Sequence, residues 1–89
     1  MVTCSAEIDG ANPGFGGTTN MRIFGGGFLG WETVNVIEFE QIARTTQADT
    51  LGSYEVIMGV PHGQYPTAHT VRTHGTLSGR TSNNAGFTV

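Results

Sequence analysis

The sequence predicts an all-β fold, a small antiparallel sandwich, barrel or meander with long glycine-rich loops and flexible terminal arms. Short segments rich in β-branched and aromatic residues alternate apolar and polar side chains, as in YEVIMGV at 54–60. Stretches of Gly, Asn, Pro and Thr separate these segments, as in DGANPGFGGTTN at 9–20. Short strands separated by turn residues are typical of sandwiches and barrels. With 89 residues, the chain is expected to form a single domain over 1–89.

The N-terminal part predicts two short strands with a long connection between them. Residues 2–8 place Val2, Cys4, Ala6 and Ile8 on one side of an extended chain, which favours a strand at a sheet edge. Residues 9–20 are turn residues, so we expect a flexible arm or loop. Phe15 in this arm is a candidate contact with the core or with a partner. Residues 21–24 predict the second strand.

Residues 28–42, FLGWETVNVIEFEQI, are compatible with two structures. A strand with a β-bulge between Val36 and Ile37 would place Val34, Val36, Ile37 and Phe39 on one face. A helix at about 33–44 would instead align Val36, Phe39 and Ala43, and would make the fold α+β. The β-branched and aromatic residues favour the strand.

The second half of the chain predicts strands separated by polar connections. In order, we expect a connection at 43–53, a strand at 54–60 ended by Pro61, a loop at 61–68, a strand at 69–77, and a turn or C-terminal tail at 78–89. Phe87 and Val89 occupy alternate positions in this tail, as expected of an extended tail that adds as a strand to the sheet edge of a neighbouring subunit.

Three consecutive glycines, Gly25, Gly26 and Gly27, suggest either a nucleotide-binding site or a backbone conformation that requires residues without a side chain. Gly25 to Gly30 match the G-x-G-x-x-G dinucleotide pattern, but that pattern requires a helix to begin after it. Here Trp31 begins a bulky, β-branched segment, so no cofactor is predicted. We expect the glycines to form a turn or bulge, or to let the Trp31 ring or a neighbouring subunit approach the backbone.

The histidines are the candidate metal ligands. His62, His69 and His74 are separated by seven and five positions, which matches no common ligand spacing. On a strand over 69–77, His69 and His74 would point to opposite faces. We therefore predict polar surface residues, and keep a metal site as the alternative that a chelator would reveal.

Other reactive side chains also have a plain structural interpretation. Glu32, Glu38 and Glu40 would be a carboxylate group only if they were buried, and we expect a solvated strand face. Cys4 is the single cysteine and is expected to be a small apolar filler. No catalytic residue is predicted, and we expect the protein not to be an enzyme.

Charge and composition limit the partners. Only 12% of residues are charged, the net charge is −3 and there is no lysine, so a nucleic-acid partner is not expected. Lysine commonly protects exposed sheet edges, so its absence favours pairing with neighbours. The N-terminus shows no signal-peptide pattern and no apolar run is long enough to span a membrane, so we expect cytoplasmic synthesis and no membrane partner.

These features predict a self-associating structural protein that forms a homo-oligomer or contacts another structural protein. Its candidate interaction residues are Phe15, Phe28, Trp31, Phe87 and Val89. In composition the chain resembles small structural proteins of virus particles, such as capsid decoration or tail components, which implies incorporation into a virion. The alternative is a small binding module or inhibitor that docks a macromolecule through the glycine-rich loop and Trp31.

Overall fold

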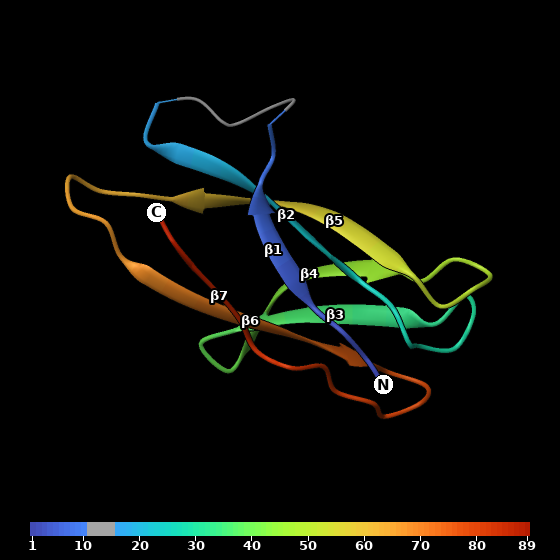
Figure 1. Cartoon of the computed structure of the whole chain (residues 1–89). Coiled ribbons are helices and arrows are strands. Elements are labelled where there is room, and N and C mark those ends of the chain that lie inside the picture. Colours follow the sequence, from blue (N-terminus) through green and yellow to red (C-terminus); the bar gives the residue numbers. More distant parts are fainter. Residues whose placement is uncertain (11–15) are drawn as a thin grey trace.

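The computed structural model describes residues 1–10 and 16–89, and this part of the chain is built from strands (Figure 1). The strands are β1 (Ser5–Ile8), β2 (Thr18–Gly25), β3 (Thr33–Glu38), β4 (Gln41–Gln47), β5 (Tyr54–Pro61), β6 (Ala68–Gly75) and β7 (Ala85–Thr88). The predicted all-β class is confirmed. Within the described ranges, no helix has the length and apolar character needed to cross a membrane.

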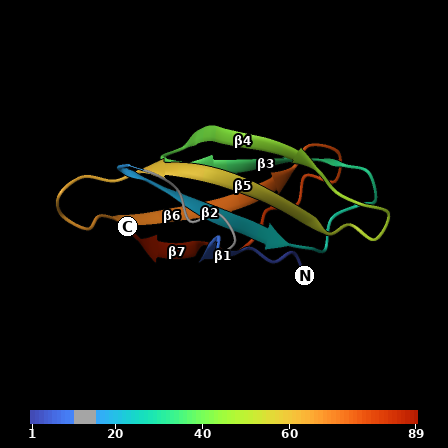
Figure 2. The ribbon, with the colours of Figure 1, turned by 90° about the horizontal axis from the view of Figure 1, so that it is seen from above.

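The strands form two antiparallel sheets that pack as a small sandwich. One sheet has the order β1-β2-β5 and the other has the order β4-β3-β6-β7. The longer strands β2 to β6 run lengthwise across the view of Figure 2, so the loops that join them gather at the two ends of the molecule.

Edge strands of one sheet contact edge strands of the other along both sides of the sandwich. On one side β4 lies beside β5, where the Thr46 hydroxyl donates to the Glu55 carbonyl at 3.4 Å. On the other side β1 lies beside β7. Nearby, the Asn83 side-chain amide bonds both the N–H and the carbonyl of Cys4 at 3.0 Å, as a neighbouring strand would. The edges of each sheet are therefore partly occupied by the other sheet.

Side chains of alternating residues fill the space between the sheets. The largest fully buried side chains are Met21, Ile23, Val34, Val36, Val71 and Thr73. Each apolar member of this set occupies alternate positions of its strand, which is the period of two that a half-buried strand requires. The Tyr54 hydroxyl, also buried, donates to the Thr3 carbonyl at 2.9 Å and lies 2.9 Å from the Thr73 hydroxyl, so its polar atom is paired inside the core.

The helix considered for 33–44 is wrong, because these residues form the β3–β4 hairpin. The predicted irregularity between Val36 and Ile37 is confirmed, but its extra residue lies on β4. Val36 faces Arg44 whereas Ile37 faces Ile42, which leaves Ala43 unmatched. The side chains of β3 continue to alternate between the two faces of the sheet. Val36 is therefore buried, whereas Phe39, three positions later, is 73% exposed. The expectation that four apolar side chains share one face is therefore also wrong.

The hairpin turns through only two residues, Phe39 and Glu40. Their φ angles are 54° and 60°, as a type I′ turn requires at both central positions. Glycine and asparagine normally occupy such positions, so this turn places two ordinary residues in left-handed backbone. Glu40 is held there by two hydrogen bonds of 2.9 Å from the Arg72 guanidinium.

Part of each predicted terminal arm belongs instead to a strand of the chain's own sheets. β2 begins at Thr18, so residues 18–20 belong to a strand; Phe15 lies outside the described residues. The proposed tail contains β7, which pairs with β6, and the Val89 backbone exchanges hydrogen bonds with Thr67. Likewise, β4 occupies part of the connection expected at 43–53, and residues 28–32 form a loop.

Candidate functional site

Three loops meet at one end of the sandwich, around the buried carboxylate of Glu32. This side chain is 2% exposed although the sequence predicted a solvated one. Its Oε2 accepts the Leu29 N–H at 2.9 Å, and its Oε1 accepts the N–H groups of Leu77 at 2.8 Å and of Ser78. Glu32 therefore ties the loop before β3 to the loop after β6.

The environment of Glu32 acts on its pKa in two directions. Burial raises the pKa, because it disfavours the charged form. The hydrogen bonds from Ser78, Leu29 and Leu77 lower it by more, so the pKa lies below its ordinary value of 4.5. Glu32 is thus an anion at neutral pH, and hydrogen bonds from the backbone N–H groups of the loops stabilise its charge.

Trp31, next to Glu32, points its ring into solvent from a constrained backbone. Its φ is 63° and its side chain is 61% exposed. The Trp31 N–H donates to the Asp49 carbonyl at 3.1 Å, and its carbonyl accepts from the Gln47 side chain at 3.0 Å. Left-handed backbone at a bulky residue persists only where the surroundings impose it, and such positions are concentrated at binding sites.

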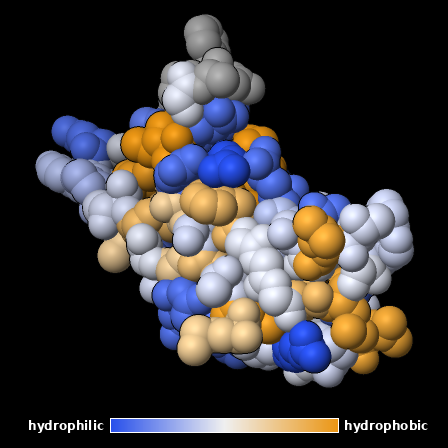
Figure 3. Space-filling model, turned by 45° about the vertical axis from the view of Figure 1, so that its right-hand side comes forward, coloured by the Kyte–Doolittle hydropathy of each residue, from blue (hydrophilic) through white to orange (hydrophobic). Residues whose placement is uncertain are grey.

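The exposed apolar side chains of these loops form what we term the end-loop surface, which consists of Leu29, Trp31, Leu51 and Leu77. Their exposed fractions are 40%, 61%, 85% and 74%. Leu51 is fixed by its own turn, where Asp49 Oδ1 accepts the Leu51 N–H at 2.9 Å and the Ser53 N–H at 3.0 Å. Figure 3, which brings this side of the molecule forward, shows hydrophobic atoms at the surface among polar ones.

The three glycines admit the N-terminal segment and do not form a hairpin turn. A Cβ on Gly25 would lie 1.9 Å from the Thr3 carbonyl oxygen, and one on Gly27 would lie 2.4 Å from that of Met1. Gly27 also has a φ of 97°, whereas Gly26 has ordinary space and no positive φ. The sequence led us to expect that the Trp31 ring or a neighbouring subunit would approach the backbone of these glycines. Residues 1–3 of the same chain take that place.

Three other predicted interaction residues, Phe28, Phe87 and Val89, lie apart from this surface. Phe28 is buried in the core, 5.5 Å between ring centroids from Tyr54, so its ring is not available to a partner. Phe87 and Val89 are half-buried against the core near the opposite end. Of the four predicted interaction residues that the structure describes, Trp31 is the one whose side chain is mostly exposed.

The histidines do not come together. His69 faces the core side of β6, where its Nδ1 lies 2.9 Å from Glu38 Oε2 and its ring stacks on Phe87 at 5.1 Å. His74 lies on the opposite face and contacts the Thr81 hydroxyl, as the strand alternation predicted. Among the residues described, no three potential ligands group around a possible metal position.

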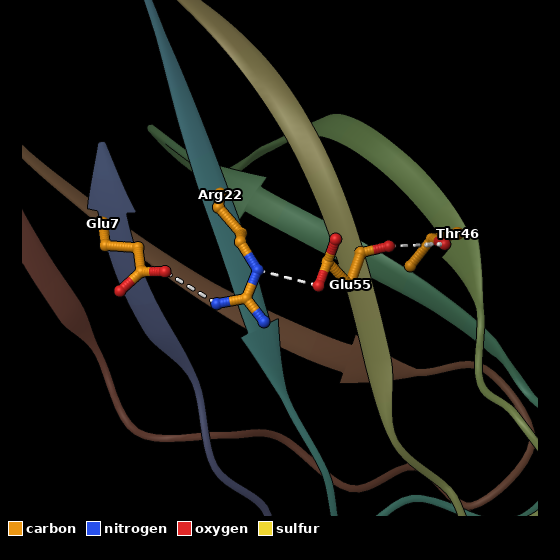
Figure 4. A network of polar contacts seen from close by, with 4 residues as sticks. All are labelled: Glu7, Arg22, Thr46 and Glu55. Carbon is orange, nitrogen blue, oxygen red and sulfur yellow. Dashed lines mark hydrogen bonds and ion pairs between the residues drawn. The ribbon is translucent and has the colours of Figure 1, made fainter. Parts of the chain in front are cut away.

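A polar network that the sequence did not reveal crosses the outer face of the three-stranded sheet (Figure 4). Arg22 Nη1 donates to Glu7 and Arg22 Nε donates to Glu55, both at 2.7 Å. The guanidinium also lies 3.9 Å from the centre of the Phe24 ring. These residues are distant in the sequence and come together only through the register of β1, β2 and β5. The sequence indicated only that each lies on the outward-facing side of its strand.

No family model, no curated protein and no solved structure matches the chain.

Proposed function

We propose that the protein is a non-enzymatic structural subunit that associates with copies of itself through the end-loop surface. The observation that carries the proposal is the exposure of four large apolar side chains on loops fixed by Glu32 and Asp49. A rigid apolar surface loses little conformational entropy when it is covered, which favours association. The resemblance in composition to structural proteins of virus particles supports a role as a capsid decoration or tail component.

The dimensions of the molecule set the expected strength of this contact. The two shorter extents are 26 and 17 Å, so an end-on contact is small compared with a standard interface of roughly 800 Å² per partner. We therefore expect weak, concentration-dependent association of free subunits, strengthened where many copies are held in one assembly.

The contact proposed here differs from exchange of terminal arms. Val2 and Cys4 are buried in the core, and β7 pairs with β6 of the same chain. Both terminal segments thus stabilise their own subunit, and the loops at the end of the sandwich are left to contact a neighbour.

The second candidate is a binding module that docks another macromolecule through the same surface. The left-handed backbone of Trp31, with its ring held in solvent, favours this function because an exposed tryptophan is a common anchor at protein interfaces.

Light scattering across a dilution series of the full chain separates the two candidates. A mass that rises with concentration supports self-association. A monomer that persists to millimolar concentration contradicts it and leaves the binding module.

A further inference from the structure

A second feature is a cleft of about 450 Å³ beside β5. It is lined by Arg22, Phe24, Gly25, Gln47, Asp49, Ser53, Tyr54 and Glu55. Its volume falls within the range of roughly 300–1,000 Å³ that is usual for small-molecule sites. Gly25 contributes backbone to the wall of the cleft.

The polar groups of this cleft are fixed in place and have unused hydrogen-bonding capacity. Arg22 is held by Glu7 and Glu55 through Nη1 and Nε, which leaves Nη2 without a partner in residues 1–10 and 16–89 (Figure 4). In the same ranges, the Ser53 hydroxyl and the Gln47 Oε1 make no hydrogen bond. Gln47 is nevertheless oriented by its bond to the Trp31 carbonyl, and Ser53 by its N–H bond to Asp49.

The arrangement of charge selects the class of ligand. Donor and acceptor groups both line the cleft: the Arg22 guanidinium pairs with the Glu55 carboxylate at 2.7 Å, and Asp49 also belongs to the lining. An anion would be repelled by the carboxylates of Glu55 and Asp49, and a cation would be repelled by the Arg22 guanidinium, so a neutral ligand avoids both repulsions. A hydroxyl both donates and accepts, so a molecule with several hydroxyls matches such a mixed lining. Phe24 adds an apolar surface for the carbon atoms of the ligand.

We propose that this cleft binds a neutral, hydroxyl-rich small molecule of the pyranose type. The Arg22 Nη2 group donates to a ligand hydroxyl, the Glu55 carboxylate accepts from one, and the Ser53 hydroxyl completes the set. The side chains that would contact the ligand are not members of the end-loop surface, but Ser53 and Leu51 share the Asp49 turn.

The test is a titration of the isotopically labelled full chain, followed by amide chemical shifts, with methyl glucopyranoside, methyl mannopyranoside, methyl galactopyranoside and N-acetylglucosamine. We expect at least one of these sugars to bind with a millimolar constant. The shifts should be confined to amides lining the cleft, such as those of Gln47, Ser53 and Glu55. Arginine methyl ester, phosphate and acetylglycinamide serve as the cationic, anionic and amide comparison probes.

Two variants and a matched control assign the contacts. Ser53→Ala and Arg22→Lys should each weaken sugar binding roughly tenfold, because each removes one hydrogen bond in a charged site. Thr70→Ala removes a similar exposed hydroxyl on β6 and should leave binding unchanged. Melting curves confirm that the variants fold; if Arg22→Lys unfolds, Ser53→Ala alone decides.

Three outcomes would overturn the proposal. The first is that none of the four sugars shifts an amide of the cleft. The second is that Ser53→Ala binds as tightly as the parent. The third is that a comparison probe binds in the cleft more tightly than every sugar, which would show that the wrong ligand class was chosen.

Discussion

The Glu32 carboxylate accepts the backbone N–H of Leu77 at 2.8 Å, across 45 positions of sequence. A buried carboxylate that takes backbone N–H groups from two loops acts as a fixed connection between them. Leu29 and Leu77 are therefore displayed by loops whose backbones share one anchor. The relative position of Leu29 and Leu77 in the end-loop surface therefore depends on the Glu32 carboxylate.

Replacing this carboxylate by an amide should destabilise the protein and loosen the surface. In Glu32→Gln one acceptor oxygen becomes an N–H₂ group facing backbone N–H donors, and we expect a loss of about 2 kcal/mol in the free energy of unfolding. Hydrogen exchange should accelerate at the amides of Leu29, Leu77 and Ser78. Glu7→Gln is the matched control, since Glu7 lies in an exposed ion pair and should lose less than about 1 kcal/mol. Equal losses in the two variants would contradict the role assigned to Glu32.

The lowered pKa of Glu32 predicts how stability depends on pH. Because the folded-state pKa lies below the ordinary value of 4.5, the stabilisation is complete above that pH and is lost as the pH falls through the folded-state pKa. Urea unfolding should show the free energy declining in this window, with a shallower decline in Glu32→Gln. Glu40, whose pKa is lowered by Arg72 but whose side chain is 81% exposed, should contribute little. A Glu40→Gln variant that flattens the profile as much as Glu32→Gln would refute this assignment.

The three consecutive glycines should tolerate alanine very differently. Gly25→Ala and Gly27→Ala each force a Cβ against the N-terminal backbone, and each should lower the free energy of unfolding by about 2 kcal/mol or more. Gly26→Ala meets the Ser53 Oγ at 3.4 Å and should change stability by less than about 1 kcal/mol. Thermal unfolding of the three variants measures this order. If Gly26→Ala is the most damaging of the three, the close approach of residues 1–3 is not what the glycines serve.

The β3–β4 turn should be improved by a residue suited to left-handed backbone. Phe39→Asn places a turn-favouring residue at φ 54° and gives up little burial, since the ring is 73% exposed. We expect the free energy of unfolding to rise by about 0.5–1 kcal/mol. Ile42→Asn makes the same kind of change in the strand interior of β4 and should lower stability. Denaturant melts that show Phe39→Asn less stable than the parent would mean that its ring contributes more than the turn strain.

Local patterns predicted the strands well where apolar residues alternate. Residues 54–60 and 69–77 correspond closely to β5 and β6, and the disruption at Val36 and Ile37 marked a true bulge. β4 was missed because QIARTTQ is exposed on most positions, so its sequence carries no core-facing alternation. β7 was placed in a tail because its pairing with β6 is visible only in three dimensions.

The sequence identified Trp31 as a candidate interaction residue. It did not predict that the buried carboxylate of Glu32 holds the loops around Trp31 in place. The burial of Glu32 depends on N–H groups from residues 45 and 46 positions later, and no local pattern announces such a partner. The same limit applies to the cleft, where Arg22 and Glu55 meet only through the register of β2 and β5. Phe28 illustrates the reverse case, because an aromatic next to glycines predicts exposure and the packing on Tyr54 buries it.

Sedimentation of the full chain and two of its variants tests the end-loop surface most directly, over concentrations from micromolar to millimolar. The parent should gain mass with concentration, whereas Trp31→Ser and Leu51→Ser should both remain monomers with unchanged folds. Ile57→Ser, which removes an apolar side chain 40% exposed on β5, should associate like the parent. A parent that stays monomeric throughout, or Trp31→Ser and Leu51→Ser variants that associate as the parent does, would contradict the account.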